Sequence, residues 1–120
     1  MLNLDTHVLL HALAGDLKPS ESRLLRGEPW SISAICLWEI CKLSQLRRIE
    51  IDLDDAEVRR TLARIHTWPL TLDVCRAIRT LDFRGDPADE LIAATSLVHN
   101  VPLVTRDARL RKSRVVPFAS

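Results

Sequence analysis

Two kinds of hydrophobic pattern alternate along the chain. Short runs of consecutive apolar residues predict strands at residues 2–4, 30–32, 68–70, 101–104 and 115–116. Between these runs, apolar residues recur every three or four positions and predict helices at residues 7–14, 19–26, 34–45, 54–66, 71–81 and from residue 86 onward. Several of these helices are bounded by local signals, such as a capping serine at Ser33 and glycines at Gly15 and Gly27.

The alternation of strands and helices defines the fold class. Strands that alternate with helices favour a parallel sheet covered by helices on both faces. The runs are continuously apolar, as is typical of parallel strands buried on both sides. A length of 120 residues fits one domain, residues 1–120. We therefore predict an α/β fold, a three-layer α/β/α sandwich with a central parallel sheet of about five strands.

Composition supports a packed core and gives no sign of a membrane protein. The chain is 47% apolar, and no apolar run approaches the roughly 20 residues that cross a bilayer. No secretory signal opens the chain, because polar residues interrupt its first apolar segment. Three cysteines lie among apolar neighbours and are expected to be buried in a reducing, cytoplasmic setting: Cys36, Cys41 and Cys75. The tryptophans are expected in the core or at its edge rather than as base-stacking surfaces: Trp30, Trp38 and Trp68.

Acidic residues occupy the junctions between predicted strands and helices. Asp5 and Asp107 follow the strands at residues 2–4 and 101–104, and Asp86 and Asp89 open a helix. In an open parallel sheet, ligands bind beyond the carboxyl ends of the strands. Each aspartate could equally be a helix cap, and the stretch DPADELIAAT by itself reads well as a helix start.

Glu39 is a different kind of candidate. It lies within the apolar helical segment AICLWEIC, where an unpaired carboxylate is costly to bury. A pairing with Lys42 on the same helix is the structural alternative. Several carboxylates that converge on one site repel one another unless a cation holds them, and hard oxygen ligands suit Mg²⁺ or Mn²⁺. His7 and His11 have a spacing that zinc can use, but no nearby cysteine or glutamate completes such a site.

Basic residues crowd the C-terminal end of the chain. The formal net charge of +1 makes no case for nucleic acid by itself. The cluster is either a solvated face or a patch that contacts phosphate, and Arg106 and Arg109, beside Asp107, are the best candidates for RNA contacts.

Four stretches resemble, in order and spacing, the acidic motifs of the PIN-domain ribonucleases. They are LDTHVLLHAL at residues 4–13, SAICLWEI at 33–40, DPADELIAATS at 86–96 and VPLVTRDARL at 101–110. The similarity extends from residue 1 to about residue 113 and is greatest to the small toxins of VapBC-type toxin–antitoxin pairs.

The resemblance implies Mg²⁺- or Mn²⁺-dependent cleavage of RNA in a PIN-like domain. One or two ions would be bound by acids at the motif positions: Asp5, Glu39, Asp89 and Asp107. Asp86 would cap the helix or hold a metal-bound water, and Thr105 matches a threonine that steadies the site. Glu90 departs from the arginine common at its position, which puts a basic contact there in doubt. The family also implies a homodimer and a small antitoxin protein as partner.

Two other functions remain open from the sequence. A catalytically silent PIN-fold module that binds RNA or protein would keep the fold without turnover. A receiver-type signalling domain has similar length and an acidic pocket, but Asp5 lacks the neighbouring acid that such domains need. The prediction is therefore a metal-dependent ribonuclease, the toxin of a toxin–antitoxin pair.

Overall fold

A four-stranded parallel sheet forms the centre of the protein. The computed structural model describes residues 1–119. The strands are β1 (Leu2–Leu4), β2 (Trp30–Ser33), β3 (His66–Trp68) and β4 (Leu103–Val104), in the spatial order β3-β2-β1-β4. The predicted parallel sheet is confirmed, with four strands in place of about five.

The order of the strands reverses at β1. Asn3 in β1 is in register with Ser31 of β2 on one side and with Leu103 of β4 on the other. The chain thus moves outward from β1 through β2 to β3 and later returns to the opposite side of β1. All strands run in the same direction, so the segments that follow β1 and β4 emerge side by side. This reversal is the position at which open α/β sheets bind ligands.

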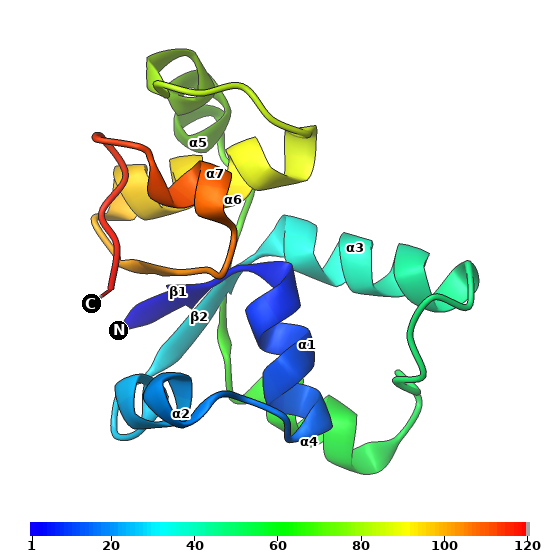
Figure 1. The fold of residues 1–120 in the computed structure, drawn as a ribbon. Coiled ribbons are helices and arrows are strands. Elements are labelled where there is room, and N and C mark those ends of the chain that lie inside the picture. The colour runs from blue at the N-terminus through cyan, green and yellow to red at the C-terminus, as the bar shows by residue number, and fades with distance from the viewer. Residues whose placement is uncertain (120) are drawn as a thin grey trace.

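Helices lie on both sides of the strands (Figure 1). They are α1 (Thr6–Ala14), α2 (Pro19–Leu25), α3 (Ala34–Gln45), α4 (Ala56–Ala63), α5 (Leu72–Ala77), α6 (Pro87–His99) and the short α7 (Ala108–Arg111). In Figure 1, α5 and α6 lie above the strands, and α2 and α4 lie below them. The arrangement confirms the predicted sandwich of sheet and helices.

Aliphatic side chains and a few small polar groups fill the core. Leu4, Ile32 and Leu103 from the sheet are completely buried, as is Ile92 from α6. Asn3 is also fully buried, and its Nδ2 donates to Ser96 Oγ at 2.9 Å and to the Ile92 carbonyl at 3.3 Å. Because a buried amide is stabilised only when it is hydrogen-bonded, this contact fixes α6 against the central strand.

One strand prediction was wrong in position and one strand is not formed within residues 1–119, and a proline adjoins each segment. The strand expected at residues 68–70 lies at His66–Trp68, since Pro69 has no N–H to extend the ladder. The strand expected at residues 115–116 is absent from the described residues. Instead, Phe118 forms an isolated parallel bridge with Leu103, and Pro117 contributes only its carbonyl, which accepts from Leu103 N at 2.9 Å.

Helix bounds and cysteine burial also differ from the predictions. The helix expected at residues 54–66 is confined to α4, capped by Asp55, because the following residues join β3. The helix expected at 71–81 is α5 followed by a 3₁₀ turn, Ile78–Thr80. Cys36 is buried as expected, but Cys41 and Cys75 are exposed. None of the helices in residues 1–119 is long and apolar enough to cross a membrane.

Candidate functional site: an acidic pocket at the sheet edge

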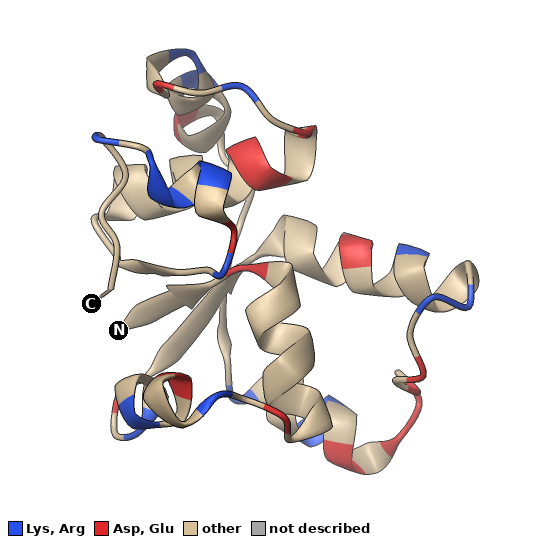
Figure 2. Ribbon diagram, in the orientation of Figure 1, with Lys and Arg blue, Asp and Glu red and all other residues tan. Residues whose placement is uncertain are grey.

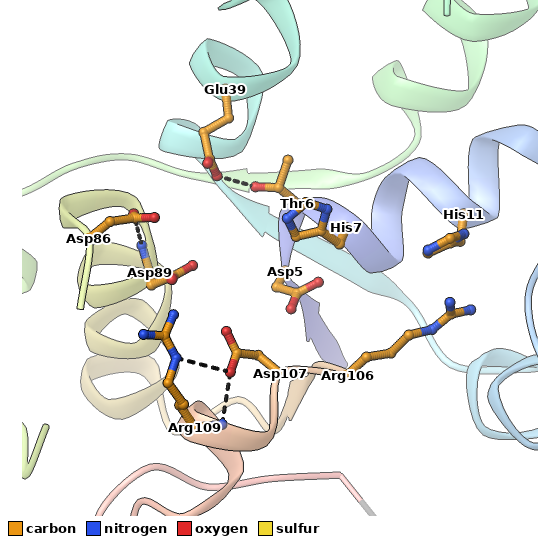
Figure 3. A pocket seen from close by; sticks show the side chains of 10 residues that line it. All are labelled: Asp5, Thr6, His7, His11, Glu39, Asp86, Asp89, Arg106, Asp107 and Arg109. Carbon is orange, nitrogen blue, oxygen red and sulfur yellow. Dashed lines mark hydrogen bonds and ion pairs between the residues drawn. The ribbon is translucent and has the colours of Figure 1, made fainter. Parts of the chain in front are cut away.

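Five carboxylates line one pocket beyond the carboxyl ends of β1 and β4. The pocket has a volume of about 460 Å³. Its acidic residues are Asp5, Glu39, Asp86, Asp89 and Asp107. Figure 2 shows acidic segments just before α1 and α7 and within α3 and α6, and Figure 3 shows the side chains from close by. The structure thus brings together every acid that the sequence singled out.

Asp5 is the most deeply placed of these acids. It follows β1, is only 4% exposed, and caps α1 by accepting from Val8 N at 2.8 Å. Burial raises the pKa of its carboxyl, and hydrogen bonds from Thr105 and Val8 partly oppose that shift. The cap and the pocket therefore use the same side chain, so the two interpretations of Asp5 are compatible.

Thr105 connects Asp5 to Asp107. Its hydroxyl donates to Asp5 Oδ2 and accepts from Asp107 N at 3.0 Å. Asp107 in turn caps α7, accepting from Arg109 N at 2.8 Å. Thr105 is 4% exposed, so both of its hydrogen bonds are shielded from water. The threonine that the sequence proposed as a supporting residue lies between two of the acids.

Glu39 and Asp86 line the opposite side of the pocket. Glu39 is half-buried and accepts a hydrogen bond from the Thr6 hydroxyl. Thr6 follows Asp5 directly, so one turn of chain after β1 contacts both sides of the pocket. Asp86 caps α6 by accepting from Ala88 N at 3.0 Å and from Asp89 N at 3.2 Å. The alternative pairing of Glu39 with Lys42 is not formed, and the Lys42 ammonium instead donates to Gln45 at 2.9 Å.

Asp89 experiences the electrostatic effect of the whole cluster. Burial, followed by repulsion from Asp86, Asp107, Glu39 and Asp5, raises its pKa to about 6. Within residues 1–119, no hydrogen bond to its carboxylate offsets this repulsion. Asp89 is thus the acid whose charge the metal-free pocket stabilises least.

The donor set fits a hard divalent cation in its chemistry. All five acids offer carboxylate oxygens, and their mutual repulsion is the kind that a bound cation relieves. Among the described residues, no three potential ligands already stand in a closed metal-binding group. Mg²⁺ commonly binds through one or two carboxylates and keeps several waters, so an open arrangement of acids is compatible with it.

The two candidate arginines differ in availability. Arg106 makes a two-pronged ion pair with Glu21 of α2, with Nη2 to Oε1 at 2.6 Å and Nε to Oε2 at 2.7 Å. This pair lowers the pKa of Glu21 to about 2. Arg106 extends toward α2 and away from the acids in Figure 3. Arg109 is highly exposed and lies 3.9 Å from Asp107 Oδ1, so it is the freer cation at the pocket.

Several residues of the site were not foreseen from the sequence. Thr6 donates a hydrogen bond to Glu39, and Glu21 pairs with Arg106. Each pair is distant in sequence, so no local pattern reveals it. His7 and His11 line the pocket, and their i, i+4 spacing was the available signal. Trp38 was expected in the core or at its edge, but it is 58% exposed.

Comparisons with known proteins agree with this geometry. The PIN domain family matches residues 3–115. A segment of 87 residues is 36% identical to Ribonuclease VapC22 of Mycobacterium tuberculosis, covering 70% of this chain and 67% of that protein.

Solved structures share the fold at low sequence identity. A toxin–antitoxin complex from Klebsiella pneumoniae is similar over 93% of this chain and 91% of its own, with a TM-score of 0.71 and 18% identity. VapBC2 from Rickettsia felis, bound to a DNA fragment from its promoter, is similar over 98% of this chain and 97% of its own, with a TM-score of 0.70 and 17% identity. On the family match and the sequence identity, this chain belongs to the PIN-domain family and, within it, to the VapC-type ribonucleases.

Proposed function

We propose that the protein is a divalent-metal-dependent ribonuclease that hydrolyses RNA phosphodiester bonds as the toxin of a toxin–antitoxin pair. One observation carries this proposal: a PIN-domain chain gathers five carboxylates around a single pocket where the strand order reverses. Such a pocket repels RNA without a cation and becomes able to bind a phosphodiester once a cation reverses the local field.

Asp5, Glu39, Asp89 and Asp107 are assigned to hold one or two Mg²⁺ or Mn²⁺ ions. Asp86 accepts hydrogen bonds from two backbone N–H groups of α6 and is assigned mainly to the helix start. A bound divalent ion would lower the pKa of a water and neutralise charge on the phosphoryl group under attack.

The remaining residues of the pocket position these acids and the RNA. Thr105 orients Asp5 and the Asp107 backbone, and Thr6 orients Glu39. Hydrogen bonds to ligating carboxylates of this kind keep the ligand set in place. Arg109 is assigned to the phosphates beside the scissile bond. Arg106 can add to that contact through its charge while it stays paired with Glu21.

The proposed partners are an antitoxin protein and a second copy of the chain. The similar Klebsiella structure is a toxin–antitoxin complex and the similar Rickettsia structure is VapBC2, which supports an antitoxin partner here. The homodimer is proposed because large apolar side chains remain exposed on the helices and at their ends, among them Leu46 at 51% and Leu72 at 72%. Sedimentation at micromolar concentration that finds only a 13.6 kDa species would argue against the dimer.

Metal-dependent turnover is the direct test of the function. Purified protein is incubated with unstructured RNA in Mg²⁺, Mn²⁺ or EDTA, alongside the Asp5→Asn variant. We expect cleavage with either metal, none with EDTA and none by the variant. Cleavage that persists in EDTA, or in Asp5→Asn, would contradict the proposal. RNA binding without turnover in both metals would instead support the catalytically silent module.

Thermal melting tests metal binding without relying on turnover. A ligand that binds only the folded chain raises its melting temperature by mass action. Added Mn²⁺ is therefore expected to stabilise the parent and to stabilise Asp89→Asn less. No rise for the parent would rule out the assigned ligand set.

A further inference from the structure

Trp38 lies on the surface although its sequence neighbours are apolar. It is in the middle of α3 and is 58% exposed. It lines a groove of about 470 Å³ with Ile35 of the same helix and with Pro87 and Ala88 at the start of α6. We call these four residues the Trp38 groove. Its volume falls within the range of small-ligand sites, about 300–1,000 Å³.

The Trp38 groove is continuous with the acidic pocket. Glu39 and Asp86 line both cavities. An RNA strand whose phosphate lies among the acids would therefore place the adjacent nucleotide at Trp38. The apolar groove and the acidic pocket offer two adjoining surfaces of opposite chemistry.

We propose that the Trp38 groove binds one unpaired nucleobase of the RNA, next to the phosphate that is cleaved. This inference rests on the proposed nuclease function and adds a recognition subsite to it. Single-stranded RNA presents splayed bases that stack on aromatic side chains. Trp38 supplies the aromatic surface, and Pro87 supplies an apolar surface from α6.

The charges around the groove favour a nucleotide over a protein side chain. The centres of protein–protein interfaces are depleted of charged residues, yet Glu39 and Asp86 line this groove directly. Lys42, four residues after Trp38 on α3, interrupts the apolar surface before Leu46 and offers a cation to a backbone phosphate. Once the proposed cation is bound among the acids, a base with phosphates on either side matches this pattern.

The first test is the kinetics of three variants on a short single-stranded RNA. We expect Trp38→Ala to lower kcat/KM by about 10-fold, mainly through KM, because stacking acts on binding. Trp38→Phe should recover most of the loss, since it restores an aromatic face. Leu70→Ala is the matched control, an exposed apolar side chain that lines neither cavity, and it should leave kcat/KM unchanged.

The second test locates the base. A series of substrates carries one abasic nucleotide, moved along the RNA one position at a time. The parent should lose about 10-fold in kcat/KM when the abasic nucleotide adjoins the cleaved bond. Trp38→Ala should be insensitive at that same position, because it has already lost the contact. Equal sensitivity of both proteins at every position would overturn the proposal.

The third test separates the subsite from the nuclease function. Tryptophan fluorescence of Asp89→Asn is titrated with the intact RNA in Mn²⁺, and the same titration is run on Asp89→Asn with Trp38→Phe. Quenching that disappears with Trp38 supports the groove even if the parent shows no cleavage. Cleavage by the parent without quenching from Trp38 overturns the groove and leaves the nuclease function intact. A parent dimer that Trp38→Ala dissociates in sedimentation would assign the groove to a second copy and also overturn it.

Discussion

The two sides of the acidic pocket are built in different ways. On the strand side, the buried Asp5 and the half-buried Asp107 cap helices and are joined through Thr105. On the helix side, Asp89 is half-buried, and among residues 1–119 no donor pairs with its carboxylate. The fold therefore uses Asp5 and Asp107 as hydrogen-bond acceptors, whereas burial and the neighbouring acids both disfavour the charged form of Asp89.

This difference shows where structure and function can be separated. A substitution at Asp5 removes a cap and a buried hydrogen bond together with any ligand role. A substitution at Asp89 removes a charge that destabilises the pocket, so a loss of activity there would report on chemistry alone.

The largest expected effect comes from comparing Asp89→Asn with Asp5→Ala. Both are expected to lower RNA cleavage by at least about 100-fold, as loss of a major electrostatic contact at a reacting phosphate does. Without metal at pH 7, Asp89→Asn should be at least as stable as the parent. Asp5→Ala should lose about 2 kcal/mol, because a cap and a buried hydrogen bond disappear. Cleavage assays and urea unfolding measure the two quantities.

Equal destabilisation by Asp5→Ala and Asp89→Asn would break the contrast between the two sides. The control is Asp55→Asn at the start of α4, which caps a helix away from the pocket. Asparagine caps about as well as aspartate, so this variant should keep both stability and activity.

The next largest effect is expected for Thr105→Val, which keeps the shape of the side chain and removes its hydroxyl. Asp5 loses a donor and the Asp107 N–H loses an acceptor. Activity should fall by about 10- to 100-fold, as with other supporting contacts around metal ligands. Unfolding should become easier by about 1–3 kcal/mol. Thr105→Ser is the matched control and should recover most of both losses; no recovery would show that packing, rather than the hydroxyl, matters.

A smaller effect concerns pH. The pKa of Asp89 is raised from 3.8 to about 6, so the folded state favours its protonated form. Stability from this preference is fully present below the unfolded pKa and is lost as pH rises through about 6. In EDTA, the free energy of unfolding of the parent should therefore fall relative to that of Asp89→Asn between about pH 4 and pH 6. Urea unfolding of both proteins across this range measures the difference; a constant difference would mean that neither burial nor the neighbouring acids raise the pKa of Asp89.

The smallest expected effect is that of Glu21→Gln. It weakens the ion pair with Arg106, which is mostly shielded from water at 12% and 27% side-chain exposure. We expect the smallest loss of stability among these variants. This contribution is present above the unfolded pKa of Glu21 and is lost as pH falls toward about 2. Cleavage should change by only a few-fold, because the substitution alters only the charge that Arg106 offers to RNA phosphates. A 100-fold loss of cleavage would instead show that the position of Arg106, fixed by Glu21, is essential for activity.

The sequence alone was sufficient to predict the candidate acids of the pocket and most helix starts. Caps are local features: Asp5, Ser33, Asp86 and Asp107 each satisfy N–H groups within three residues of themselves. Continuous apolar runs predicted a parallel sheet, whose strand ends share one edge, and this was sufficient to expect Asp5 and Asp107 close together.

Tertiary structure decided what lies against each local feature. Glu21 and Arg106 are 85 residues apart in the chain, and Thr6 and Glu39 are 33 apart, so only packing could pair them. The sequence placed Trp38 in the core or at its edge, but the start of α6 covers it only in part, and it lines a groove at 58% exposure. Periodicity tells which side chains share a face of a helix; it carries no information about whether another part of the chain reaches that face, because that depends on contacts between residues far apart in sequence.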